Sequence, residues 1–199
     1  RIVRPDWSGT PAAVKPLVMR DVYQRKRSSA LPTCQDRHMV NKKYVATNRI
    51  VEREELNDFI RPRHHGVLLT SRRDGWPQSS LVSMGLDDPG DVPARIVVSS
   101  YPERAKVHNL RRNPQASMVV QSDEWNGEFV QVDGTAEVLD LPAALDGLCD
   151  YFRVISGEHP DWDEYRDAMT QQGKCLIRLT IERWGPIAKG GFPARLVTD

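Results

Sequence analysis

The order of strand-like and helix-like segments is the sequence feature that most limits what this chain can fold into. A β-rich run begins at Gly66, an Asp74-Gly75 pair marks a hairpin turn, and a second β-rich run follows to Leu86. Further strand-like runs occupy residues 94–101, 116–122, 128–139 and 174–184. Because strands and helices do not alternate regularly, a doubly wound parallel sheet is not expected. The order predicts an α+β fold that is mainly β, in which a small antiparallel barrel carries peripheral helices.

Four helices are predicted from apolar spacing and from residues that start or stop a helix. Residues 51–62 place three apolar side chains at helical spacing and end at a proline. A short helix is expected over residues 102–113, because it starts at Pro102 and stops before Pro114. Two more are expected from Pro142 and over residues 159–172, whereas the tail after residue 184 is rich in turn residues.

Charge is distributed unevenly along the chain. The 199 residues carry a formal charge of +1. Residues 1–38, however, hold eight Lys and Arg against three Asp and Glu, and the remainder is mildly acidic. With four prolines and no sustained period, residues 1–38 are predicted to form a basic irregular N-terminal arm, or an extension from expression or upstream translation. A nucleic-acid-binding tail is an alternative. The rest of the sequence, however, shows no segment that combines basic and aromatic residues as a nucleic-acid-binding groove does, so nucleic acid is not an expected partner. Residues 39–199 form the predicted folded domain.

Several classes of function lack their sequence signatures. The chain has no G-x-G-x-x-G, Walker A, H-E-x-x-H or G-x-S-x-G motif. Its three cysteines, Cys34, Cys149 and Cys175, lack metal-ligand spacing, and adjacent His64 and His65 on a strand would face opposite sides, so no metal is predicted. No apolar run reaches the roughly 18 residues that cross a bilayer. A cytoplasmic protein without a membrane partner is therefore expected.

Residues 99–114, SSYPERAKVHNLRRNP, contain the clearest candidate for ligand binding. Arg104 and Lys106 fall near the start of a predicted helix that follows directly on a strand. The free amides at a helix N-terminus attract phosphate, which arginine can grip with two hydrogen bonds and lysine with a point charge, while Ser99 and Ser100 offer hydroxyl donors. A solvated basic helix face is the alternative that the residues alone leave open.

From Glu52 to Ile187 the chain resembles the split β-barrel flavin- and deazaflavin-binding proteins related to pyridoxamine 5'-phosphate oxidase, and within them the actinobacterial F420-dependent branch. The segments that carry the resemblance are GVLLTSRRDGWPQSSLV, SYPERAKVHNLRRNPQASMVV, VQVDGTAEV and GEHPDWDEYRDAM. The second segment is the most specific. In it a basic pair is followed by Asn-Leu, and then by a stretch rich in basic residues that ends at a proline. The resemblance implies a split antiparallel β-barrel of the FMN-binding type, making residues 39–199 a cofactor-binding domain.

The same resemblance implies which residues bind the cofactor, in a groove between two subunits of a homodimer. Arg104 and Lys106 match the positions that contact the cofactor phosphate, and Gln78 and Ser80 match positions beside the ring and ribityl chain. The remaining matches are Ser99, Asn109 and Trp125, at or next to other groove positions, and Lys174, at a basic position contributed across the dimer. Each of the last three also has a structural interpretation: Asn109 as a helix-surface amide, Trp125 as a turn aromatic and Lys174 as an edge lysine.

The function implied is that of an F420-dependent oxidoreductase, which transfers a hydride between the deazaflavin and an unsaturated small molecule. No catalytic acid or base is identified, because a reduced deazaflavin carries its own hydride. An FMN-dependent enzyme of the pyridoxamine 5'-phosphate oxidase type is the first alternative. A protein that binds a flavin or deazaflavin without turnover is the second, since a fold does not determine a function.

Overall fold

A computed structural model describes residues 45–90, 92–124 and 126–196. The predicted arm over residues 1–38 and the candidate Trp125 lie outside these residues. The strands are β1 (Thr47–Arg49), β2 (His65–Ser71), β3 (Pro77–Ser83), β4 (Gly85–Asp87), β5 (Arg95–Ser100), β6 (Gln115–Gln121), β7 (Glu128–Leu139), β8 (Cys175–Trp184) and β9 (Ile187–Lys189). The helices are α1 (Arg53–Ile60), α2 (Ala105–Arg112), α3 (Leu145–Ser156) and α4 (Trp162–Gln171), followed by a 3-10 turn at Ala194–Leu196.

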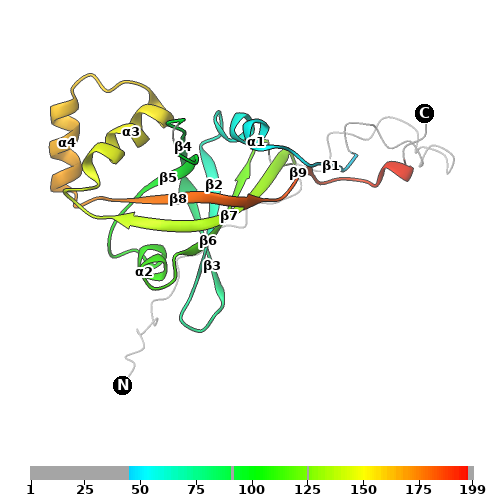
Figure 1. The fold of residues 1–199 in the computed structure, drawn as a ribbon, viewed down its shortest axis with the longest axis horizontal. Helices are drawn as coiled ribbons and strands as arrows, with labels where there is room; N and C mark the ends of the chain where they lie inside the picture. Colours follow the sequence, from blue (N-terminus) through cyan, green and yellow to red (C-terminus); the bar gives the residue numbers. More distant parts are fainter. Residues whose placement is uncertain (1–44, 91, 125, 197–199) are drawn as a thin grey trace, which may run out of the picture. The chain divides into compact units, whose positions relative to one another are not determined.

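All the strands join one antiparallel sheet. Its order is β3-β2-β6-β7-β8-β5-β4, and β9 pairs with both β7 and β1. The sheet curls so that the long β7 and β8 cross β2, β3 and β6 (Figure 1). This is a split antiparallel β-barrel with helices at its periphery, so the fold expected from the order of segments and from the resemblance is confirmed.

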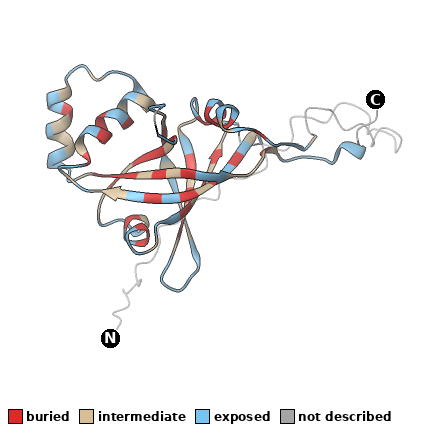
Figure 2. Ribbon diagram, in the orientation of Figure 1, coloured by how far each residue is buried: buried red, intermediate tan, exposed pale blue. Residues whose placement is uncertain are grey.

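The core follows from the alternation of side chains along the strands. In β2 the inward residues include Leu68 and Thr70, which are buried, whereas the alternating Val67 and Leu69 are only half-buried. Figure 2 shows the same alternation of buried and less buried positions along the neighbouring strands. One face of the curled sheet therefore forms the apolar interior.

The helices cover different parts of the sheet. Val107 and Leu110 of α2 join the core of the barrel. A second, smaller core packs Leu148 of α3 and Tyr165 of α4 against Leu176 of β8. The two helices stand together beyond β5 and β4, and α2 lies apart from them on the other side of β7 and β8 (Figure 1).

The helix expected before Pro114 is confirmed as α2, but its predicted start is wrong. The predicted helix over residues 102–113 begins only at Ala105, because the Arg104 amide first donates to the Tyr101 carbonyl and closes a turn. Arg104 is therefore the residue that precedes the helix. The tail, described from the sequence as rich in turn residues, also contains β9, which is three residues long and has no alternation to reveal it. The short β1 was not predicted, and β4 was included in the run to Leu86 rather than predicted as a separate strand.

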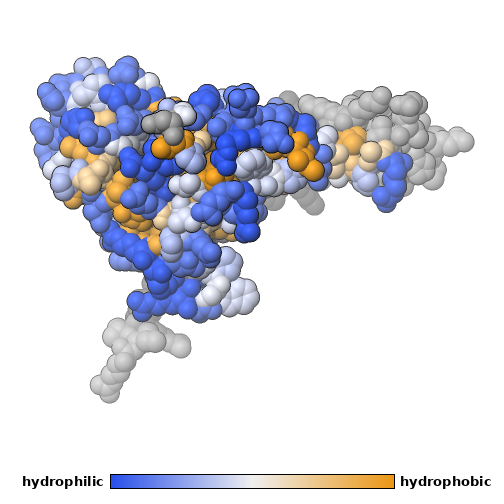
Figure 3. All heavy atoms as spheres, in the orientation of Figure 1, coloured by the Kyte–Doolittle hydropathy of each residue, from blue (hydrophilic) through white to orange (hydrophobic). Residues whose placement is uncertain are grey.

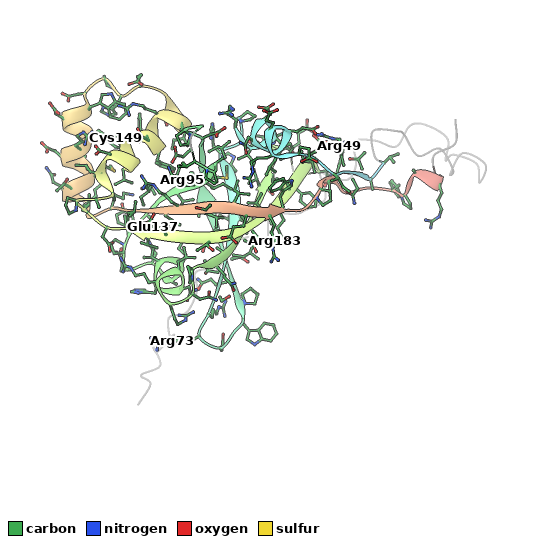
Figure 4. The ribbon with its side chains drawn as sticks, in the orientation of Figure 1. Arg49, Arg73, Arg95, Glu137, Cys149 and Arg183 are labelled. Atoms are coloured by element: carbon green, nitrogen blue, oxygen red, sulfur yellow. The ribbon has the colours of Figure 1, made fainter. Side chains whose placement is uncertain are left out.

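Two of the three cysteines lie in the part of the chain that the structure describes. Cys149 on α3 (Figure 4) and Cys175 on β8 are both buried free thiols in different elements. Within residues 45–90, 92–124 and 126–196, no three His, Cys, Asp or Glu side chains are grouped as metal ligands. None of the helices in this part of the chain has the length and apolar character needed to cross a membrane. The cytoplasmic location stays a prediction.

Candidate functional site

A groove lies where β3, β5, α2 and the start of β8 meet the α3–α4 pair. It has a volume of about 390 Å³, which is within the range of small-molecule sites. Its lining includes Val82, Ser99, Lys106, Tyr151, Met169 and Lys174. Figure 3 shows apolar atoms between α3–α4 and α2, interrupted by hydrophilic ones. The groove thus combines apolar surface with two cationic side chains from separate elements.

The N-terminus of α2 borders this groove and is built differently from the other helix starts. No side chain caps it, which is also true of α1 and α3, but its first turn contains no acidic residue. At α4, in contrast, the Asp161 carboxylate accepts hydrogen bonds from the Asp163 and Glu164 amides. Among the four α-helices that the structure describes, α2 alone has no acidic residue in its first turn. Its first amides are therefore left for an anion.

Three cationic side chains gather around that N-terminus. Lys174 Nζ lies 3.8 Å from the centre of the Tyr101 ring, and the Arg104 guanidinium carbon lies 5.7 Å from the same centre. Lys106 lines the groove together with Lys174. Within the described residues, no carboxylate forms an ion pair with any of the three cations. Cations that share one site without a counter-charge favour binding of an external anion.

The position of Lys106 affects its protonation. Its side chain is half-buried, and this burial, with a smaller contribution from the nearby positive charge of Arg104, lowers the pKa of Lys106 below its usual value. Both effects disfavour the charged amine. A bound anion would favour the charged amine and so raise the pKa of Lys106 again. The electrostatics of the free site therefore favour binding of a negatively charged group.

Two polar side chains of β3 lie close to the groove in sequence, although they are not among its lining residues. Gln78, Ser80 and Val82 alternate onto one face of β3, and Val82 lines the groove. Asn109 of α2 is buried and donates from Nδ2 to Thr70 Oγ1 at 3.0 Å and to Gln78 Oε1 at 3.3 Å. The interpretation of Asn109 as a helix-surface amide is therefore wrong, because this side chain joins α2 to β2 and β3.

The α3–α4 side of the groove offers mostly apolar surface. The Tyr151 hydroxyl donates to the Ser83 carbonyl, and the Tyr165 hydroxyl donates to the Leu148 carbonyl. Burial raises the pKa of Tyr151 and that of Tyr165, the latter to about 12, so both phenols stay neutral near neutral pH. With their hydroxyls occupied, the two tyrosines meet the groove only through the small exposed part of each ring, since each residue is 8% exposed.

Most of the residues singled out from the sequence lie around this groove. Ser99, Lys106 and Lys174 line it, Arg104 adjoins it through Tyr101, and Gln78 and Asn109 are hydrogen-bonded to each other. Ser80 shares the face of Gln78. Ser100, also considered as a donor, is buried and faces the barrel interior instead. That these residues bind a cofactor, and that Lys174 acts across a dimer, stay predictions.

Sequence reasoning did not identify three contributors. Tyr101 contacts two cations, and its place three residues before Arg104 was a usable signal. Arg112 holds Asn109 at an i, i+3 spacing that the predicted helix could have indicated, whereas nothing in the sequence reveals the contact of Asn109 with Thr70. The adjacent histidines behave as expected: His64 Nδ1 meets the Met84 carbonyl, and His65 Nδ1 meets an Asp123 carboxylate oxygen, so they share no ligand.

Comparison with known proteins identifies relatives of this fold. The family described as pyridoxamine 5'-phosphate oxidase matches residues 53–188. A conserved hypothetical protein from Mycobacterium tuberculosis is 20% identical with a TM-score of 0.57, and the match covers 70% of this chain and 86% of that one. The FAD and heme binding protein from Mycobacterium smegmatis is 16% identical with a TM-score of 0.55, over 72% and 74% of the two chains. The heme storage protein from Vibrio cholerae is 21% identical with a TM-score of 0.52, over 69% and 95%.

Proposed function

Because the chain belongs to the pyridoxamine 5'-phosphate oxidase family, we propose that its groove binds a phosphorylated flavin-type cofactor and that the protein is an F420-dependent oxidoreductase. The observation that carries this proposal is the group of cations without counter-charges at the uncapped start of α2. In the proposed complex Arg104 and Lys106 hold the cofactor phosphate. The bound cofactor supplies the hydride for an unsaturated small-molecule acceptor, while the protein orients the two and excludes water.

The residues present fit such a cofactor. Cationic side chains and free helix amides suit the phosphate, Gln78 and Ser80 suit polar atoms of a ring and its ribityl chain, and the apolar α3–α4 side of the groove suits flat apolar surface. The preference for the deazaflavin over FMN rests on the sequence pattern of residues 100–120. The matching family's own description makes an FMN-dependent enzyme the alternative. Two similar structures are named for binding or storage, which favours a non-catalytic binding protein as a further candidate.

Binding and turnover experiments separate these candidates. In parallel titrations we expect the deazaflavin coenzyme to bind more tightly than FMN, whereas preferential, stoichiometric FMN binding would support the FMN-dependent enzyme. Reduced coenzyme should then be oxidised when quinones, nitro compounds or enones are supplied, as followed at its visible absorbance band. Tight binding without turnover over that panel would support the binding protein.

The lowered pKa of Lys106 gives a prediction about pH. Since the charged amine would hold the phosphate, cofactor affinity should fall as pH rises through the lowered pKa of Lys106, below the usual lysine value of about 10.4. In Lys106→Arg the guanidinium stays protonated, so the alkaline loss should disappear. Dissociation constants measured from neutral pH to about pH 10 check this. An identical alkaline loss in wild type and Lys106→Arg would remove Lys106 from the phosphate site.

We also propose that the protein is a homodimer in which the cofactor groove is shared. Leu81 is 85% exposed on β3, and its partner Val67 on β2 pairs in turn with Val119 on β6. These three side chains form one row across the sheet, on the face opposite the core. Exposed apolar residues in a row mark an interaction surface, and in the proposed homodimer a second copy of the chain covers them.

Leu81→Glu is expected to weaken the dimer at least tenfold, because it places a charge in the middle of that row. Sedimentation velocity at micromolar concentration measures the change. Ile50→Glu is the matched control, since Ile50 is 89% exposed but lies between β1 and α1. A wild-type monomer that binds cofactor at full affinity would contradict the shared groove, and equal effects of both substitutions would contradict this interface.

A further inference from the structure

The orientation of the Asn109 amide is determined by Arg112. The Arg112 side chain has only hydrogen-bond donors, and its Nη1 and Nη2 lie 3.4 Å and 3.3 Å from Asn109 Oδ1. Arg112 Nη2 also donates to the Ser71 carbonyl, which ties the guanidinium to the end of β2. A donor-only group must meet an acceptor, so the oxygen of the Asn109 amide faces Arg112 and its nitrogen faces away.

The nitrogen of Asn109 in turn determines the orientation of Gln78. Asn109 Nδ2 reaches Thr70 Oγ1 and Gln78 Oε1, and because this nitrogen can only donate, the atom of Gln78 that it meets must be the oxygen. Asn109 is 7% exposed and Thr70 is 3% exposed, so water cannot readily replace these bonds. Gln78 Nε2 is left with two donors, and no acceptor for them is found among the described residues.

Those free donors lie beyond the residues that line the groove, farther along β3. Gln78 shares the face of β3 with Val82, which lines the groove. On α2, Lys106 and Asn109 are three residues apart and therefore lie on the same side of the helix. Asn109 and Gln78 therefore lie farther along α2 and β3 than the groove residues Lys106 and Val82, so a ligand held at Lys106 that extends along these two elements would approach the Gln78 amide nitrogen.

We infer that Asn109 is a positioning residue, which holds Gln78 so that this position offers a hydrogen-bond donor and selects a ligand with an acceptor there. A carbonyl or an unprotonated nitrogen of a ring has the required chemistry, whereas a ring N–H at the same place would leave two donors facing each other. The orientation of Gln78 does not depend on the proposed function. The choice of a ring as the ligand, in contrast, rests on the proposed function.

Side-chain amide exchange with solvent, measured by NMR on the free protein, tests the orientation directly. In the wild type the Asn109 Nδ2 protons should be protected and the Gln78 Nε2 protons should exchange at least tenfold faster. Asn109→Asp replaces the donor by an acceptor, so Gln78 should turn round, and its Nε2 protons should then become protected. Protected Gln78 protons in the wild type would overturn the inference even if the variant did not fold.

Binding of FMN, used as the probe, tests the selection. Gln78→Glu keeps an acceptor for Asn109 but offers no donor to the groove, so both Gln78→Glu and Asn109→Asp should weaken FMN binding about tenfold or more. Arg112→Lys retains a donor-only cation, so the Asn109 oxygen should still face residue 112 and the Gln78 Nε2 protons should still be the faster to exchange. His108→Ala, at an exposed neighbouring position on α2, is the control for local damage.

The outcomes separate this inference from the proposed function. If FMN binding is lost in Arg104→Ala but is unchanged in Gln78→Glu, the phosphate site stands and the selection by Gln78 is wrong. If neither FMN nor the deazaflavin binds the wild type, the proposed function fails, while amide exchange still decides how Asn109 positions Gln78.

Discussion

Arg104→Ala is expected to weaken cofactor binding by roughly one to two decades, because a charge-assisted hydrogen bond contributes about 1.5 to 3 kcal/mol. Arg104 is exposed, precedes the first turn of α2 and has no carboxylate partner among the described residues. Its removal should therefore leave the free energy of unfolding almost unchanged. Fluorescence titration with the deazaflavin coenzyme and with FMN measures the loss of affinity, and thermal unfolding measures stability.

Related substitutions distinguish a phosphate contact from a general charge effect. Lys106→Ala should weaken binding more mildly, since lysine contributes a point charge where arginine offers a planar pair of donors. Arg104→Lys should restore only part of the affinity for the same reason. His108→Ala should have no effect. If neither Arg104→Ala nor Lys106→Ala changes affinity by more than twofold, the phosphate site is wrongly assigned and α2 simply has a solvated basic start.

Gly134→Ala should have the largest effect on stability. Gly134 lies at the point where the register between β7 and β8 shifts, and a Cβ atom at this position would lie 1.8 Å from the Thr180 carbonyl oxygen. That oxygen belongs to the backbone of a central strand, so it cannot move aside as a flexible side chain would. We expect a loss of about 3 kcal/mol or more, equivalent to a decrease in Tm of roughly 6–12 °C.

Gly185→Ala is the matched control for this prediction. Gly185 follows β8, and the nearest atom to a Cβ there is the Gln131 carbonyl oxygen at 3.8 Å, which is an ordinary contact. Its Tm should change by no more than a few degrees. Equal Tm values for Gly134→Ala and wild type would show that β7 and β8 do not approach each other as closely as described.

The sequence predicts the long elements of this fold well because their signals are local. β8 was expected from its apolar run, and the β2–β3 hairpin from the Asp74-Gly75 turn, whose neighbour Arg73 lies at the hairpin tip (Figure 4). Three-residue strands such as β9 depend on pairing partners that are distant in sequence, so their own residues do not reveal them. The late start of α2 has a local origin instead, since the turn closed by the Tyr101 carbonyl and the Arg104 amide competes with a proline that favours a helical start.

The residues of the candidate site also differ in how well the sequence predicts them. The basic residues after β5 could be identified, because strand, turn and helix follow one another along the chain. The contact of Asn109 with Thr70 and Gln78 could not, because it joins residues 39 and 31 positions apart. Lys174 was placed by resemblance alone, and its contact with Tyr101 depends on how β8 begins beside β5.

A crystal structure of the protein with the deazaflavin coenzyme bound would test the central claim most directly. The account predicts that the phosphate lies within hydrogen-bond distance of Arg104 and Lys106, and that an acceptor atom of the ring meets Gln78 Nε2. A coenzyme bound instead in the separate hollow lined by Ser117, Asp133 and Arg183, with its phosphate away from α2, would contradict it.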